Sequence, residues 1–174
     1  MYCNQVIRRL IPLVLLLALP AAEAKPRKPR FGFQHFTARY TGGYSIATAT
    51  GTQAGPAKIR IRAATTGRSA NVDWSNTFYT SGGSYEVTLH WTFSPDGAVS
   101  ATTIDPNRAS FPATGAFELN ANHPVKFTAT DATGTVMATG QLRLIGGGAL
   151  GITVTLTGLP EGDVTYGFSG SRVR

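Results

Sequence analysis

The stretch that decides the fold is YEVTLHWTFSPDGAVSATTI, residues 85–104. Over Tyr85–Phe93, apolar and polar side chains alternate, which is the period-two pattern of a β-strand with one buried face. Ser94-Pro95-Asp96-Gly97 then supplies the residues of a tight turn, because proline fixes φ, aspartate bonds to nearby backbone and glycine accepts a positive φ. Ala98–Ile104 resumes the alternation. The stretch therefore predicts an antiparallel hairpin.

The same alternation recurs over most of the chain after Phe36. Gly, Pro, Asn and Asp separate the alternating segments, and no stretch of a dozen residues has helical spacing. The further strands that we predict are Thr37–Gly51, Ala57–Thr65, Ser69–Trp74, Ala116–Leu119, Val125–Thr130, Thr135–Ile145, Leu150–Leu156 and Asp163–Val173. Inside the first of these we expect a bulge or sharp bend at Gly42-Gly43, since glycine within a strand often marks one.

One apolar face per strand provides one layer of core, so the sheet must close on itself or pack against a second sheet. Short connections between neighbouring strands favour an all-β, antiparallel up-and-down meander that closes as a β-barrel of about 8–10 strands. A two-sheet β-sandwich is the alternative. The connection Asp105–Gly115 contains Pro106 and Pro112 and is long enough to cross between sheets, as Greek keys do.

Residues 1–24 have the parts of a secretory signal peptide: a pair of arginines, an apolar run over Leu10–Ala22, and small residues before a cleavage point between Ala24 and Lys25. A helix that spans a bilayer needs ~20 apolar residues, and this run is shorter. We expect cleavage there and export to the periplasm or the cell exterior. Cys3 would leave with the signal, so the mature chain would contain neither disulfides nor thiolate metal sites.

The positive charge is concentrated near the predicted mature N-terminus. The chain has 16 Lys and Arg against 9 Asp and Glu, a formal net charge of +7, yet from Phe31 onward ten cations face eight anions. We therefore predict a basic Pro-rich linker over 25–35, followed by a single β domain over 36–174. Contact with an anionic envelope polymer or membrane surface is expected from the linker cations and one basic strand face: Lys25, Arg27, Lys28, Arg30, Lys58, Arg60 and Arg62. Specific nucleic-acid binding is not expected.

Aromatic side chains on the apolar strand faces provide candidate ligand contacts. The interior of a barrel with eight or more strands holds one small ligand in some proteins and is filled by side chains in others. The candidates are Trp74, Tyr85, Trp91, Phe93 and Phe127. The sequence thus favours an exported, non-catalytic β domain that binds a small apolar ligand or a surface polymer, or that acts as a structural module.

Motifs for catalysis are weak. His35, His90 and His123 lack the close spacing of a metal site, and Gly167-Phe168-Ser169-Gly170 lacks the spacing of a nucleophile elbow. We predict no catalytic residue, metal ligand or cofactor. Strands can nevertheless bring distant acids together, so the alternative is a hydrolase that acts on a cell-envelope or extracellular polymer.

Two further hypotheses concern the surface. The row Thr153, Thr155 and Thr157 lies on the polar face of one predicted strand and could contact a glycan. An exported, β-rich chain could also be an outer-membrane barrel, which requires an apolar outward band.

Overall fold

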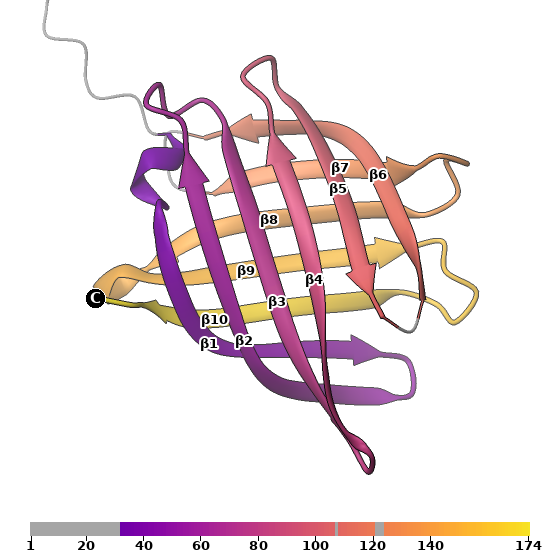
Figure 1. Cartoon of the computed structure of the whole chain (residues 1–174). Coiled ribbons are helices and arrows are strands. Elements are labelled where there is room, and N and C mark those ends of the chain that lie inside the picture. The colour runs from indigo at the N-terminus through magenta and orange to yellow at the C-terminus, as the bar shows by residue number, and fades with distance from the viewer. Residues whose placement is uncertain (1–31, 107, 121–123) are drawn as a thin grey trace, which may run out of the picture.

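The computed structural model describes residues 32–106, 108–120 and 124–174, with the side chains of 105 and 108–111 excepted, and this part is all-β (Figure 1). The predicted signal, its cleavage point and the cations of 25–30 lie outside it, as does His123. The described residues form ten strands and two short 3-10 helices: η1 Phe33–His35, β1 Ala38–Thr48, β2 Gly51–Ala63, β3 Ala70–Thr80, β4 Gly83–Phe93, β5 Ala98–Asp105, β6 Arg108–Leu119, β7 Val125–Asp131, β8 Met137–Ile145, η2 Gly146–Gly148, β9 Ala149–Thr157 and β10 Val164–Arg172. None of the described helices is long and apolar enough to cross a membrane.

Each strand pairs antiparallel with the next one in the chain, and β1 pairs with β10 to close a barrel. The predicted all-β meander barrel is confirmed, and the sandwich alternative is wrong because a closed ladder leaves no second sheet. The hairpin that led to the prediction forms as expected between β4 and β5. Its turn is closed by hydrogen bonds from the Gly97 N–H to the Ser94 carbonyl and from the Ala98 N–H to Asp96 Oδ1, with Gly97 at a φ of 93°.

No bulge forms at Gly42-Gly43, whereas the alternative that we predicted, a bend, agrees with the strongly curved course of β1 in Figure 1. β1 pairs without a register shift with β2 and with β10 across both glycines. A Cβ at Gly42 would instead collide with the backbone of Ser169 and Gly170 on β10. The glycine permits close approach of two backbones, which is its other common role within a strand.

The connection predicted over Asp105–Gly115 is also wrong, because most of it is strand β6. Pro112 misled the interpretation, since proline usually interrupts a strand. In the barrel it pairs with Thr102 of β5, while the β6–β7 ladder ends one residue away, at Ala113↔Asp131. Proline lacks a backbone N–H and can sit in a strand where that side of the ladder has no partner.

A second proline marks the corresponding place on β2. The β2–β3 ladder ends at Ala57↔Asn76, and Pro56 is the next residue of β2, still paired with Gly43 of β1. Beyond this point the hairpins β1–β2 and β3–β4 separate, as Figure 1 shows. The strand predicted over Ser69–Trp74 is correspondingly too short, since β3 continues to Thr80 within its own hairpin.

The apolar strand faces point inward, and their buried side chains form one core. One end of the barrel is closed by η1, whose Phe33 ring lies 5.0 Å from the Phe93 ring and 5.5 Å from the Phe117 ring. Phe33 and Phe36 are both fully buried, so packing begins within the segment that we predicted as linker. The Val173 N–H donates to the Arg39 carbonyl, which ties the C-terminal residues to the same end (Figure 1).

Candidate functional site

A cavity of about 420 Å³ opens at the end of the barrel opposite η1. Its lining residues come from the strand halves at this end, for example Ile46 and Tyr85, and from the β9–β10 loop, for example Leu159. The volume falls in the range of about 300–1,000 Å³ that is usual for small-molecule sites. The two ends of the barrel therefore differ: one is filled by aromatic rings and the other is hollow.

The hollow end results from an uneven distribution of side-chain size. Four adjacent strands, β5 to β8, contribute alanines to the wall: Ala101, Ala113, Ala129 and Ala138. Large rings stand on β3 and β4, where the Phe78 and Tyr85 rings stack 5.2 Å apart with an interplanar angle of 14°. Trp91 lies deeper, with its ring 5.0 Å from that of Phe127. Small residues among large ones leave space that the core does not fill.

The five aromatic candidates divide into two groups. Tyr85, Trp91 and Phe127 line the cavity. Trp74 and Phe93 are fully buried and pack in the core beneath it, with the Trp74 ring 5.8 Å from the Trp91 ring. The predicted ligand contact of the first group stays a prediction, whereas the second group supports the floor.

Phe127 owes its position to a glycine on the neighbouring strand. Gly140 of β8 is paired with Phe127, and a Cβ at Gly140 would collide with the Phe127 ring. The Phe127 ring therefore lies over Gly140 of β8, because glycine has no side chain that would occupy this space. Such cover of a strand glycine by a cross-strand aromatic also stabilises the pair.

Asn76 is the polar side chain at the centre of this apolar arrangement. It occupies an inward position of β3 between Trp74 and Phe78, it lines the cavity, and it is only 1% exposed. Neither Oδ1 nor Nδ2 of its amide has a hydrogen-bond partner among the described residues. Sequence reasoning missed Asn76 because the alternation was followed only to Trp74; two further steps would have placed Asn76 and Phe78 inside.

The cavity carries little charge. Among the described lining residues Glu161, which lies in the exposed β9–β10 loop, is the only side chain charged at neutral pH, and no lysine, arginine or histidine is present. The other polar groups of the lining are uncharged: Thr48, Gln53, Thr103, the hydroxyls of Tyr85 and Tyr166, and Asn76. The site is suited to a neutral molecule.

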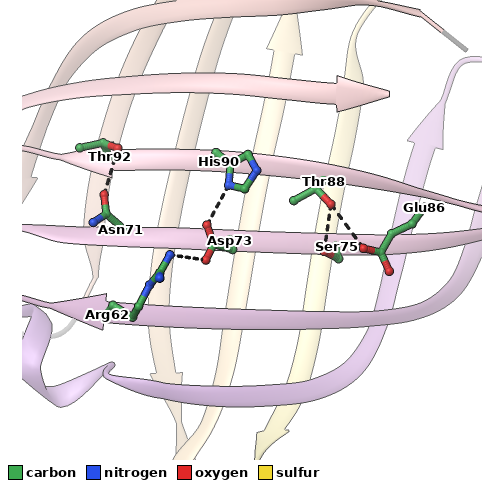
Figure 2. A network of polar contacts seen from close by, with 8 residues as sticks. All are labelled: Arg62, Asn71, Asp73, Ser75, Glu86, Thr88, His90 and Thr92. Carbon is green, nitrogen blue, oxygen red and sulfur yellow. Dashed lines mark hydrogen bonds and ion pairs between the residues drawn. The ribbon is translucent and has the colours of Figure 1, made fainter. Parts of the chain in front are cut away.

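A second polar cluster lies on the outer face of β2, β3 and β4, and Figure 2 shows it. Asp73 accepts from Arg62 Nη2 at 2.7 Å and is paired with His90 Nδ1 at 2.8 Å. Ser75 Oγ pairs with Thr88 Oγ1 at 3.0 Å and not with His90, so no nucleophile–base–acid relay is assembled. These contacts join neighbouring strands, and exposed ion pairs of this kind contribute about 0.2–1 kcal/mol.

The basic strand face predicted from Lys58, Arg60 and Arg62 is exposed on the outside of β2. Arg62 is engaged with Asp73, and the register places exposed Arg39 of β1 opposite Arg60, a neighbour that sequence reasoning did not identify. Polyanion contact there stays a prediction. Within the described residues, no group of three or more His, Cys, Asp or Glu could hold a metal ion.

No family model and no curated protein matches the chain. Among solved structures, the chain is similar to Rv2717c from M. tuberculosis, with a TM-score of 0.56, 11% identity, and coverage of 82% of this chain and 97% of that chain. At this identity the similarity concerns the fold alone. A "putative outer membrane protein" from Bacteroides fragilis aligns over 80% of this chain and 98% of its own at 10% identity, but its TM-score of 0.21 does not establish a shared fold.

Proposed function

We propose that this protein is an exported binding protein that holds one small, uncharged apolar molecule in the open end of its barrel. The observation that carries the proposal is the cavity of about 420 Å³, lined by the alanines of β5 to β8 and by aromatic rings such as those of Phe78, Tyr85 and Trp91. A purely structural module has no need of such a space, because unfilled volume in a core weakens packing.

The direction of the strand faces supports a barrel that works in water. Apolar side chains point inward, and the outer faces of β2 to β4 carry the charged and hydroxyl groups drawn in Figure 2. A barrel that spans an outer membrane needs the opposite arrangement, with an apolar band outside. This favours a ligand carrier over the outer-membrane hypothesis.

The hydrolase hypothesis has less support. Glycosidase chemistry needs two carboxyl groups across the scissile bond, and Glu161 is the only carboxylate in the described lining of the cavity. The Asp73–His90 pair lies on the outer face of the barrel, and neither residue lines the open hollow next to it, which Arg62, Asn71 and Thr92 border. Binding without chemistry is therefore the better proposal.

Filling the cavity tests the proposal. The purified protein should take up a neutral apolar dye with saturation at one molecule per chain, measured by fluorescence and native mass spectrometry. The double variant Ala129→Leu, Ala138→Leu should abolish uptake, because leucines at these positions occupy the space. Ala116→Leu, on the exposed outer face of β6, is the matched control and should bind like the wild type. Undiminished uptake by the double variant would contradict the proposal.

Export is the other half of the proposal and rests on the signal-like residues 1–24. N-terminal sequencing of the protein recovered from outside the cytoplasm tests it. A chain that begins at Lys25 supports export, and an uncleaved cytoplasmic chain contradicts it.

A further inference from the structure

We infer that Asn76 is the polar anchor of this cavity and that the ligand is a flat, neutral molecule with a hydrogen-bond donor and acceptor side by side, as on a lactam or carboxamide edge. This inference rests on the proposed function and names the ligand chemistry of the same site. Its starting point is that the Asn76 amide is buried, faces the cavity and has no partner for either of its polar atoms among the described residues.

The local fold explains why the protein leaves this amide unpaired. Asn76 stands at the last pair of the β2–β3 ladder, opposite Ala57 on β2 and Val87 on β4, and neither side chain has a polar atom. The next residue of β2 is Pro56, which has no N–H to donate. The two hairpins thus separate at the same place where a buried, unpaired amide borders the cavity.

An unpaired buried amide weakens a protein, and most such groups in native structures have a partner. An apolar residue such as leucine would fit the surroundings at lower cost, since Trp74 and Phe78 flank the position. A polar residue held there at the expense of stability is expected where it serves binding, because it selects a ligand that completes its hydrogen bonds.

The chemistry of the amide defines the complement. Asn presents an acceptor and a donor next to each other, so a group with an adjacent donor and acceptor forms two hydrogen bonds with it. A carboxylate is disfavoured, since the described lining holds no cation to pair with it and the mouth carries Glu161. A neutral cis-amide edge satisfies both conditions.

The walls define the rest of the molecule. The stacked rings of Phe78 and Tyr85 and the ring of Trp91 provide flat apolar surfaces, and the alanines of β5 to β8 leave space beside them. Aromatic side chains pack well against planar rings by offset or edge contacts. The body of the ligand is therefore planar and apolar.

Two probes of nearly identical shape separate the contribution of Asn76 from that of the walls. 2-Quinolone carries a lactam N–H next to its carbonyl, and coumarin has a ring oxygen in place of that N–H; naphthalene lacks both polar groups. Affinities are measured by titration calorimetry and by quenching of tryptophan fluorescence. We expect the wild-type protein to bind 2-quinolone about tenfold more tightly than coumarin, as one extra buried hydrogen bond provides.

The variant Asn76→Leu should bind the two probes equally and naphthalene at least as well as the wild type does, and its Tm should rise because an unpaired amide is removed. Equal affinity of the wild type for 2-quinolone and coumarin, or a preference that survives in Asn76→Leu, overturns the inference but leaves the cavity as an apolar site. If no probe binds the wild type, naphthalene included, the proposed function fails together with it. Because the wild-type comparison is decisive alone, the test does not depend on the variant's folding.

Discussion

At the scale of single residues, the cavity depends on a few side chains that are unusual for their positions. Asn76 is polar where the inward-facing residues on either side of it along β3 are apolar, and Gly140 lacks a side chain where Phe127 needs room. Inward strand positions are usually apolar, and paired strand positions usually carry a side chain, so both residues depart from the usual pattern. Such departures from local consistency are expected at functional sites, where packing is not the only requirement.

Gly140 gives a direct test of this packing. Gly140→Ala should lower the free energy of unfolding by roughly 1–3 kcal/mol, because the new Cβ displaces the Phe127 ring from the cavity wall. The measurement is chemical denaturation. Gly43→Ala is the control, since a Cβ at Gly43 meets its nearest neighbour, the Gly55 carbonyl oxygen, at an ordinary 3.5 Å and should cost less than about 0.5 kcal/mol. Equal losses in the two variants would contradict the packing of Phe127 described above.

At the scale of elements, the alternation of side chains was sufficient to predict most strands and the meander, because period two is a local property of each segment. It failed where a residue's role depends on a neighbouring strand. Pro112 suggested a loop, and Gly42-Gly43 a bulge, yet both are explained by what lies beside them: no partner on one side of Pro112, and the backbone of Ser169 close to Gly42. The aromatic candidates divided between the wall and the floor of the cavity for the same reason. Alternation predicts which side chains point inward, but not how deep along the barrel axis each of them lies.

The turn between β7 and β8, next to the cavity residue Val136, is held by Asp131. Its carboxylate accepts from Thr133 Oγ1 at 2.9 Å and from the Thr135 N–H at 2.9 Å. Partial burial acts to raise the pKa of Asp131, but these hydrogen bonds outweigh it and hold the pKa below its ordinary value of 3.8. A depressed pKa in the folded state stabilises the fold above the ordinary pKa, and this stabilisation is lost as the pH falls through the lowered value.

Asp131→Asn should therefore lower the Tm at pH 7, and the difference from the wild type should shrink as the pH is taken below about 4. Thermal unfolding followed by circular dichroism over a pH series measures this. Asp163→Asn, which removes an exposed charge before β10, serves as the charge-matched control and should leave the Tm nearly unchanged. A difference for Asp131→Asn that is constant with pH would show that the carboxylate charge does not support the turn.

At the scale of the whole molecule, the barrel has one closed and one hollow end. η1 and the rings of Phe33 and Phe93 fill the first, while the alanines of β5 to β8 and the separated hairpins leave the second open. The similarity to Rv2717c extends over most of both chains but concerns the fold alone, so the ligand must be argued from the residues of this cavity. We infer that a ligand enters the hollow end and reaches Asn76.

An NMR titration of the isotope-labelled protein with 2-quinolone tests whether a ligand reaches Asn76. We expect saturable shifts of the Asn76 side-chain amide and of signals from the lining residues Tyr85, Trp91 and Ala129, with no change at η1 or at the outer cluster around Asp73. The absence of any shift at Asn76 and the lining residues, or shifts confined to the outer face of β2 to β4, would contradict it.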